Sequence, residues 1–393
     1  MKVVIAPDSF KGAISAPDAA RAIARGWERV FPDAECVRLP VADGGEGTAA
    51  TLAAATGGTL HEVMVTGPLG DDGPRAAARW ALLGDRETAV VELAEAAGLT
   101  LVPPERRDPK HTTTRGVGEL LRAAARYPGV RRVLVALGGS ATNDGGAGIL
   151  QALGVRLRDA AGNELPPGGA ALARLASADA SEAETLEGVE VVIACDVDNP
   201  LTGPRGASAV FGPQKGATPA DVALLDSALA HYATVLEKAP HPWSRDTPGA
   251  GAAGGTAAGL LWAFPQAQLH PGIQIVLDAT DFDRHVQGAA LVLTGEGRLD
   301  AQTLGGKVVA GVARRAGAAT GGTVPVGAIV GAVAPDVDPA LLARTLGVGA
   351  VIPLAPGPCT LEESVANAEP WLADAAERAA RWWAFGVQAS RGD

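Results

Sequence analysis

The sequence predicts an α/β protein in which a parallel sheet, built from both ends of the chain, carries an inserted second domain. Up to about residue 58, short apolar runs alternate with helical patterns, which is typical of parallel sheets covered by helices. The same alternation returns in the C-terminal part, whereas the middle is less regular. We therefore expect one α/β domain from residues 1–75 and 285–393, and a mixed α/β domain from residues 76–284.

In the N-terminal segment, two strands are each followed by a helix. The first strand is the apolar run 3–6, and Ser15 with Asp18 predicts the cap of the helix after it. A second strand is expected over residues 36–42 and a second helix over residues 48–56.

The inserted segment combines hairpins with longer elements. Strands over 79–83 and 88–93 are joined by Gly84-Asp85, which indicates a hairpin. A second hairpin is expected over 155–165. Gly249 to Gly254 matches a dinucleotide fingerprint, but no strand precedes it, so we expect no Rossmann motif there. The remaining expected elements are strands at 133–137 and 189–195, a helix from about 147, and a helix from Thr218 to Leu236.

The C-terminal segment again alternates strands and helices. Its elements are strands at 290–294, 324–330 and 350–354 and helices at 306–318 and 339–346. Thr360 and Glu363 form a capping box, which predicts the start of a long final helix reaching about Phe385.

Composition narrows the class of protein. The chain has 393 residues, 47% of them hydrophobic, and a net charge of -11, which argues against nucleic acid as the main partner. No apolar run is long enough to span a membrane, and Met1-Lys2 leads directly into a strand, so we expect neither membrane segment nor signal peptide. The three cysteines are scattered, which fits a reducing cytoplasm.

Five polar loops each follow the carboxyl end of an expected strand; they begin at Asp8, Asp43, Gly138, Asp196 and Glu296. Ligands of open parallel sheets bind outside those strand ends, so we expect the loops to line a cleft between the two lobes. Glycine-rich loops that open helices also suit phosphate, because backbone N–H groups and the positive helix end converge there. The loops could instead be turns or helix caps without ligand, and Glu296, Arg298 and Asp300 could be a structural ion-pair cluster.

Lysine is scarce, since only six of the 33 cationic residues are lysines. Three of them, Lys11, Lys215 and Lys307, adjoin a glycine. A point charge beside backbone donors suits phosphate, although each could also be an ordinary surface lysine.

Cations around phosphates, carboxylates for Mg²⁺ and one carboxylate near an attacking hydroxyl are the parts that phosphoryl transfer needs. The chain contains neither a P-loop motif nor the His-Arg-Asp of protein kinases, so it belongs to neither class. As the proton acceptor we favour Asp196, because it directly follows a strong apolar strand and has Asp198 two residues further on. Asp43 and Asp300 are the next candidates.

Six motifs resemble those of the bacterial glycerate kinase family, of the glycerate 2-kinase type, in the expected order. They are A-P-D-S-F-K-G (6–12), V-A-D-G-G-E-G-T (41–48), L-G-G-S-A-T-N-D-G-G-A-G (137–148), A-C-D-V-D-N-P-L (194–201), V-F-G-P-Q-K-G-A (210–217) and T-G-E-G-R-L-D-A-Q-T (294–303). The resemblance implies ATP as co-substrate, Mg²⁺, D-glycerate as acceptor and 2-phosphoglycerate as product. It also implies a flavodoxin-like domain that carries the insertion.

The candidate site residues all lie in or beside these motifs. For catalysis they are Asp196, Lys11 and Asp43; for substrate binding Asp8, Ser9, Lys11, Arg298 and Asp300; for nucleotide or phosphate binding Gly44, Gly45, Glu46, Gly138, Gly139, Ser140, Asn143, Asp144, Lys215, Gln302, Thr303 and Lys307; and for metal binding Asp198 and Glu296.

Two alternatives stay open. One is a kinase that acts on another small hydroxy acid or on the 3-hydroxyl of glycerate, and the other is a non-catalytic protein that binds a phosphorylated acid. In each case we expect small-molecule partners only, no nucleic acid and no membrane, and a monomer or homodimer.

Overall fold

The protein was analysed as a computed structural model, which describes all residues except 184–185, 187, 239–244, 301–307, 336 and 391–393. Its contacts divide the chain into two compact units. Unit 1 consists of residues 1–43, 54–56 and 273–393, and unit 2 of residues 44–53 and 57–272.

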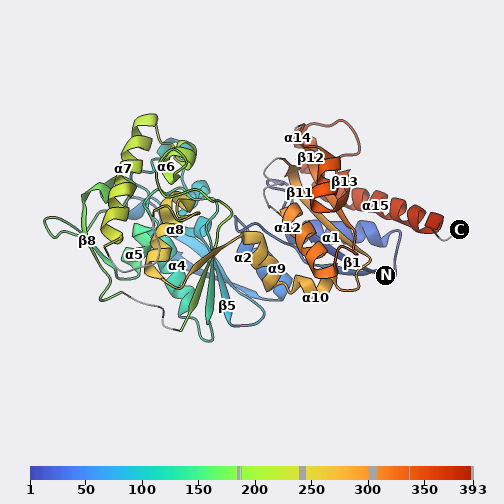
Figure 1. Cartoon of the computed structure of the whole chain (residues 1–393), viewed down its shortest axis with the longest axis horizontal. Coiled ribbons are helices and arrows are strands. Elements are labelled where there is room, and N and C mark those ends of the chain that lie inside the picture. The colour runs from blue at the N-terminus through green and yellow to red at the C-terminus, as the bar shows by residue number, and fades with distance from the viewer. Residues whose placement is uncertain (184–185, 187, 239–244, 301–307, 336, 391–393) are drawn as a thin grey trace. The chain divides into compact units, whose positions relative to one another are not determined.

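Unit 1 contains a five-stranded, all-parallel sheet that draws strands from both ends of the chain, seen as blue and orange-to-red arrows in Figure 1. The strands are β1 (Lys2–Pro7), β2 (Glu35–Arg38), β11 (Leu291–Leu299), β12 (Val326–Val333) and β13 (Val348–Pro353). Their order is β13-β12-β11-β1-β2. Counted along the unit this is 2-1-3-4-5, the flavodoxin-like order, which confirms the predicted fold class.

The helices of unit 1 include a closely packed pair, α1 (Ala16–Glu28) and α15 (Ala368–Ser390). A Cβ atom on Gly26 would lie 1.9 Å from the carbonyl oxygen of Ala373, so only glycine allows the two helices to approach this closely. Trp27 and Leu372 are fully buried in the same core. The other helices are α9 (Gly272–Ala279), α10 (Phe282–Val286), α12 (Val308–Thr320), α13 (Pro339–Leu346) and α14 (Leu361–Ala366).

The single long final helix predicted from the sequence is wrong. The capping box of Thr360 and Glu363 is present, but the helix that it starts, α14, ends at Ala366. Asn367, with φ -110° and ψ 16°, interrupts the helix and α15 begins at Ala368.

Unit 2 contains a six-stranded mixed sheet of order β10-β9-β6-β5-β4-β3. The strands are β3 (Thr59–Val65), β4 (Ala76–Leu82), β5 (Thr88–Glu92), β6 (Arg132–Ala136), β9 (Glu190–Ala194) and β10 (Gln268–His270). Strands β5, β6, β9 and β10 run parallel, whereas β3, β4 and β5 pair antiparallel. The predicted hairpin of β4 and β5 is therefore confirmed, and residues 59–65, which we expected in the first domain, belong to this sheet.

Unit 2 also contains helices and a small second sheet. The helices are α2 (Thr48–Thr56), α3 (Leu93–Ala97), α4 (Arg115–Ala125), α5 (Ala147–Ala152), α6 (Ala207–Phe211), α7 (Pro219–Leu236) and α8 (Ala252–Ala263), of which α2 ends in unit 1. In the small sheet, β7 (Arg156–Asp159) pairs with β8 (Leu175–Asp179). The hairpin expected over residues 155–165 is present in a short form. Arg158 bridges Glu164, and the Asp159 and Leu165 N–H groups donate to the Asn163 and Leu157 carbonyls at 2.9 and 2.8 Å, while β7 also pairs with β8.

Among the described residues, none of the helices combines the length and apolarity that crossing a membrane would require.

We predict that Gly26→Ala destabilises unit 1 by about 2–3 kcal/mol, because the new methyl group overlaps the backbone of α15 and the helices must separate. Gly317→Ala is the matched control: Gly317 lies inside α12 with open space around its Cβ position. There alanine should stabilise the helix by up to about 1 kcal/mol. Thermal unfolding followed by circular dichroism measures both, and equal midpoints for the two variants would contradict the predicted close approach.

Candidate active site

In unit 1 the sheet has a topological switch point between β1 and β11, and several candidate residues gather there. The two strands pair as far as Pro7 and Gly295, and the Asp8 N–H donates to the Gly295 carbonyl at 2.8 Å. A Cβ atom on Gly297 would lie 3.4 Å from Phe10, so the loop after β1 lies against the end of β11. Ligands of such sheets bind where the strand order reverses, which makes this edge a candidate binding site.

Acidic groups and one lysine share this edge. Asp8 is 8% exposed, and burial, followed by the charge of Asp43, raises its pKa to about 6, while the Ser9 hydrogen bonds and Lys11 lower it. Lys11 itself is exposed and Ser9 is half-buried. The Asp8 carboxylate thus lies within electrostatic reach of both a cation and a second carboxylate, an arrangement that suits an anionic ligand with a hydroxyl group.

The candidates on β11 differ in exposure. Glu296 is 6% exposed, Arg298 is exposed, and Asp300 is half-buried just after the strand. Gln302, Thr303 and Lys307 lie outside the described residues.

In unit 2 three candidate loops meet at the carboxyl edge of the sheet. The Gly138 N–H donates to the Gly44 carbonyl at 3.3 Å, and a Cβ atom on Gly138 would lie 2.6 Å from the Cα of Gly45. A Cβ atom on Gly44 would lie 3.1 Å from Ala194, at the end of β9. The loops after β6 and β9 and the segment 44–47 therefore contact one another through glycine, and each fixes the position of the others.

Gly139 is a turn residue with φ +74°, and its carbonyl accepts a hydrogen bond from the Leu99 N–H at 2.8 Å. Replacing it by alanine would strain the backbone whether or not a ligand binds there. A Gly139→Ala variant therefore does not separate a ligand-binding loop from a structural turn.

Asp144 caps helices. It is 1% exposed, and its carboxylate accepts hydrogen bonds from the Thr114 N–H at 2.8 Å, the Thr114 hydroxyl at 2.9 Å, the Gly146 N–H at 3.2 Å and the Gly148 N–H at 3.3 Å. Burial raises the pKa of Asp144, and these hydrogen bonds oppose the rise. The carboxylate thus joins the N-terminal ends of α4 and α5.

Lys215 and Asn143 are buried beside it. Lys215 is 1% exposed, and its Nζ donates to the Ser140 hydroxyl at 2.8 Å and to the Thr142 carbonyl at 2.6 Å. Asn143 donates from Nδ2 to the Ser208 hydroxyl at 2.9 Å. These side chains hold the loop after β6 from its buried side, while Gly139 is exposed.

The two aspartates after β9 have different partners. Asp196 is exposed, and its Oδ1 accepts the N–H of Gly272, the first residue of α9, at 2.7 Å. Both carboxylate oxygens of Asp198 accept from Arg205 at 3.0 Å. Only Asp196 is fixed by the backbone, and this orients its carboxylate.

Sequence reasoning missed Glu92, the last residue of β5. It is 2% exposed, and its carboxylate accepts the Gly47 N–H at 2.9 Å and the Ala49 N–H at 2.5 Å. Burial raises the pKa of Glu92 to about 7, and the two hydrogen bonds oppose the rise. The signal was present, because Glu92 follows an apolar strand just as Asp196 does.

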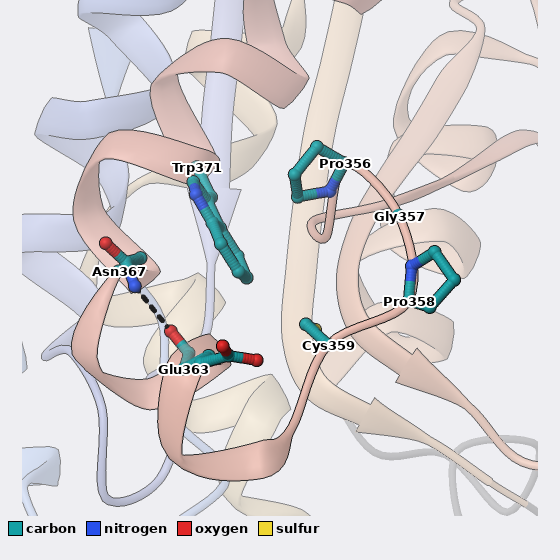
Figure 2. Close-up of a pocket in the computed structure, with 7 residues that line it drawn as sticks. All are labelled: Pro356, Gly357, Pro358, Cys359, Glu363, Asn367 and Trp371. Atoms are coloured by element: carbon teal, nitrogen blue, oxygen red, sulfur yellow. Dashed lines mark hydrogen bonds between the residues drawn. The ribbon is translucent and has the colours of Figure 1, made fainter.

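A pocket of about 380 Å³ lies elsewhere in unit 1, after β13. Figure 2 shows Glu363, Asn367 and Trp371 on helical segments facing a loop that contains Cys359. The other lining residues are Pro356, Gly357 and Pro358. No candidate site residue lines this pocket, so we do not assign the site to it.

Comparison with known proteins gives concordant matches over nearly the whole chain. The model of the glycerate kinase family matches residues 3–384. A glycerate kinase of Bacillus subtilis is 50% identical over 382 residues, which cover 97% of this chain and 96% of that protein. A glycerate 2-kinase of Escherichia coli is 46% identical and covers 99% of both chains. A crystal structure described as a glycerate kinase 2 of Salmonella typhimurium LT2 superposes with a TM-score of 0.87 at 46% identity, covering 99% of each chain.

We predict that Lys215 makes the stability of the protein pH-dependent. Burial lowers the pKa of Lys215 from 10.5 to about 7, so between these values the unfolded chain binds one more proton than the folded one. Stability from this group therefore rises with pH from about 7 to 10.5, by at most about 1.4 kcal/mol per pH unit. Urea unfolding at several pH values should show that Lys215→Met, which has no titrating amine, loses this rise. Parallel profiles for wild type and variant would contradict the prediction.

Proposed function

The chain belongs to the glycerate kinase family, and from this premise we propose that it transfers the γ-phosphoryl group of ATP to the 2-hydroxyl of D-glycerate, giving 2-phosphoglycerate. The observation that carries the proposal is the match over 99% of both chains to a glycerate 2-kinase. The strand-end loops add a physical argument, because they present a lysine and several carboxylates, the groups that phosphoryl transfer uses.

The acid substrate is assigned to the switch-point residues of unit 1. Glycerate carries a carboxylate, and an acidic protein must supply local cations to bind it. Lys11 and Arg298 are exposed there and can do so. The carboxylates of Asp8, Asp43 and Asp300 can accept hydrogen bonds from the two hydroxyl groups, and the Ser9 hydroxyl can accept or donate one.

The nucleotide is assigned to the glycine loops of unit 2. Gly44, Gly45 and Glu46 form one loop, and Gly138, Gly139 and Ser140 form the other. Asn143, Asp144 and Lys215 support this site from its buried side, and we propose no direct contact with nucleotide for them.

Asp196 is the proposed general base. The acceptor alcohol is protonated at neutral pH, and its proton must leave as the hydroxyl oxygen attacks the γ-phosphorus. The Gly272 N–H holds one carboxylate oxygen of Asp196 and so orients the group. The carboxylate takes the proton, the O–P bond to glycerate forms, and the bond from the γ-phosphorus to the bridging oxygen of ADP breaks.

Mg²⁺ commonly enters kinase sites with the nucleotide, held by phosphate oxygens and one or two carboxylates. In the part of the chain that is described, no three potential metal ligands cluster. Asp198 has both oxygens on Arg205, and Glu296 is 6% exposed. Neither fits a metal site as found, so no step is derived through the ion.

The first test is the reaction itself. We expect the purified protein to consume ATP only when D-glycerate is present and to form 2-phosphoglycerate, identified by ³¹P and ¹³C NMR. Formation of 3-phosphoglycerate would correct the regiochemistry. Turnover only with a different hydroxy acid would change the acceptor, and binding of a phosphorylated acid without turnover would favour the non-catalytic alternative.

The second test concerns the base. Asp196→Asn keeps size and polarity but removes the proton acceptor, so we expect kcat to fall roughly 10²–10⁴-fold, with KM for glycerate changed much less. Asp226→Asn is the matched control, because Asp226 likewise accepts a backbone N–H, that of Gly203 at 2.9 Å, but lies outside the candidate loops. If Asp196→Asn keeps the kcat of the control, the base is another carboxylate, with Asp43 and Asp300 next.

A further inference from the structure

Glu92 has no catalytic assignment, yet it is one of the few fully buried carboxylates of unit 2. It ends β5 at the carboxyl edge of the sheet, where the candidate loops meet. Oε2 accepts the Gly47 N–H and Oε1 accepts the Ala49 N–H, at 2.9 and 2.5 Å. With both oxygens engaged and 2% of the residue exposed, Glu92 cannot itself reach a substrate.

What Glu92 holds is the segment that starts α2. Gly44 and Gly47 have φ values of +82° and +89°, a conformation that few residues other than glycine adopt. Such a turn is flexible unless it is tied down. One hydrogen bond within the segment, from the Thr48 hydroxyl to the Gly45 carbonyl at 2.7 Å, restrains the turn. Glu92, at the end of β5, adds two further hydrogen bonds.

The position of this segment matters because it touches both neighbouring loops. Gly44 accepts the Gly138 N–H and lies beside Ala194 and Gly272. Gly272 in turn donates to Asp196, the proposed base. A shift of residues 44–47 therefore moves the groups around the reacting centre.

We propose that Glu92 is a positioning residue of the proposed kinase site: by holding the N–H groups of Gly47 and Ala49, it fixes the loop 44–47 in the geometry that receives ATP. This inference rests on the proposed function and deepens it, since Glu92 would contribute to ATP binding without contacting ATP itself.

Glu92→Gln tests the inference. Glutamine keeps the size but offers one acceptor oxygen, and its amide NH₂ must face the other backbone N–H, so the loop loses one tie. We expect KM for ATP to rise at least tenfold, with KM for glycerate within about twofold of wild type. Removing a nearby negative charge would by itself favour an anionic nucleotide, so a rise in KM for ATP reports a displaced loop.

Glu119→Gln is the matched control. Glu119, on α4, also accepts a backbone N–H and a hydroxyl, both from Thr66, at 2.8 and 2.9 Å, but it holds the turn after β3. Both variants replace a carboxylate that accepts a backbone N–H by an amide, and only the Glu92 variant should change KM for ATP. Partial unfolding lowers the amount of active enzyme and leaves both KM values unchanged. A rise in KM for ATP without a rise in KM for glycerate therefore indicates a positioning role and not a loss of stability.

The inference is overturned if Glu92→Gln has the KM values of Glu119→Gln, or if only KM for glycerate rises. Should Glu92→Gln not fold, Glu92→Asp decides. It keeps the charge but is one methylene too short to hold both N–H groups, so the same split is expected, and wild-type KM values would overturn the inference. Wild type is assayed in parallel: without ATP-dependent turnover of glycerate in wild type, it is the proposed function that fails.

Discussion

Carboxylates at the N-terminal ends of helices hold the candidate loops of unit 2 in place. The first N–H groups of a helix have no partner within it, and the helix dipole makes this end positive. Glu92 takes this position at α2, Asp144 at α4 and α5, and Asp196 at α9. Each carboxylate comes from outside the helix that it caps, so Glu92 and Asp144 fix α2, α4 and α5 to the carboxyl edge of the unit 2 sheet.

This arrangement changes the expected role of the glycine loops. A strand, a glycine turn and a helix start predict an anion site, because the helix end offers N–H groups and positive charge. Here the carboxylates of Glu92 and Asp144 accept hydrogen bonds from several of those N–H groups. Those N–H groups are then no longer available to an anionic ligand. Glycine serves instead for close approach, as where Gly138 meets Gly45.

Periodicity was enough to predict the fold class and most elements, because the buried strands are short apolar runs and the caps are local. The helix at residues 48–56 and the hairpin of β4 and β5 depend on neighbouring residues, and both were predicted correctly. The break at Asn367 was not predicted, although its Nδ2 bonds the nearby Glu363 carbonyl at 2.8 Å. The pairing of β7 with β8 was not predicted either, because residues 160–174 separate the two strands in sequence. In the site, the loops could be located but not the burial of Asp144 and Lys215, nor the hydrogen bonds that Glu92 accepts from Gly47 and Ala49, which are 45 and 43 positions away in sequence. Sequence spacing reports which polar residues follow a strand and says nothing about which backbone groups they will meet.

The sheet of unit 1 has a consequence for biosynthesis. β11, a partner of β1, follows it about 290 residues later in the chain, since Val3 pairs with Leu291. At roughly 5–20 residues per second, this interval lasts about 15–60 s. All six strands of the unit 2 sheet are complete by His270, so that unit can fold on the ribosome while β1 still lacks β11. During this time β1 can pair only with β2, and the unit 1 sheet is completed last.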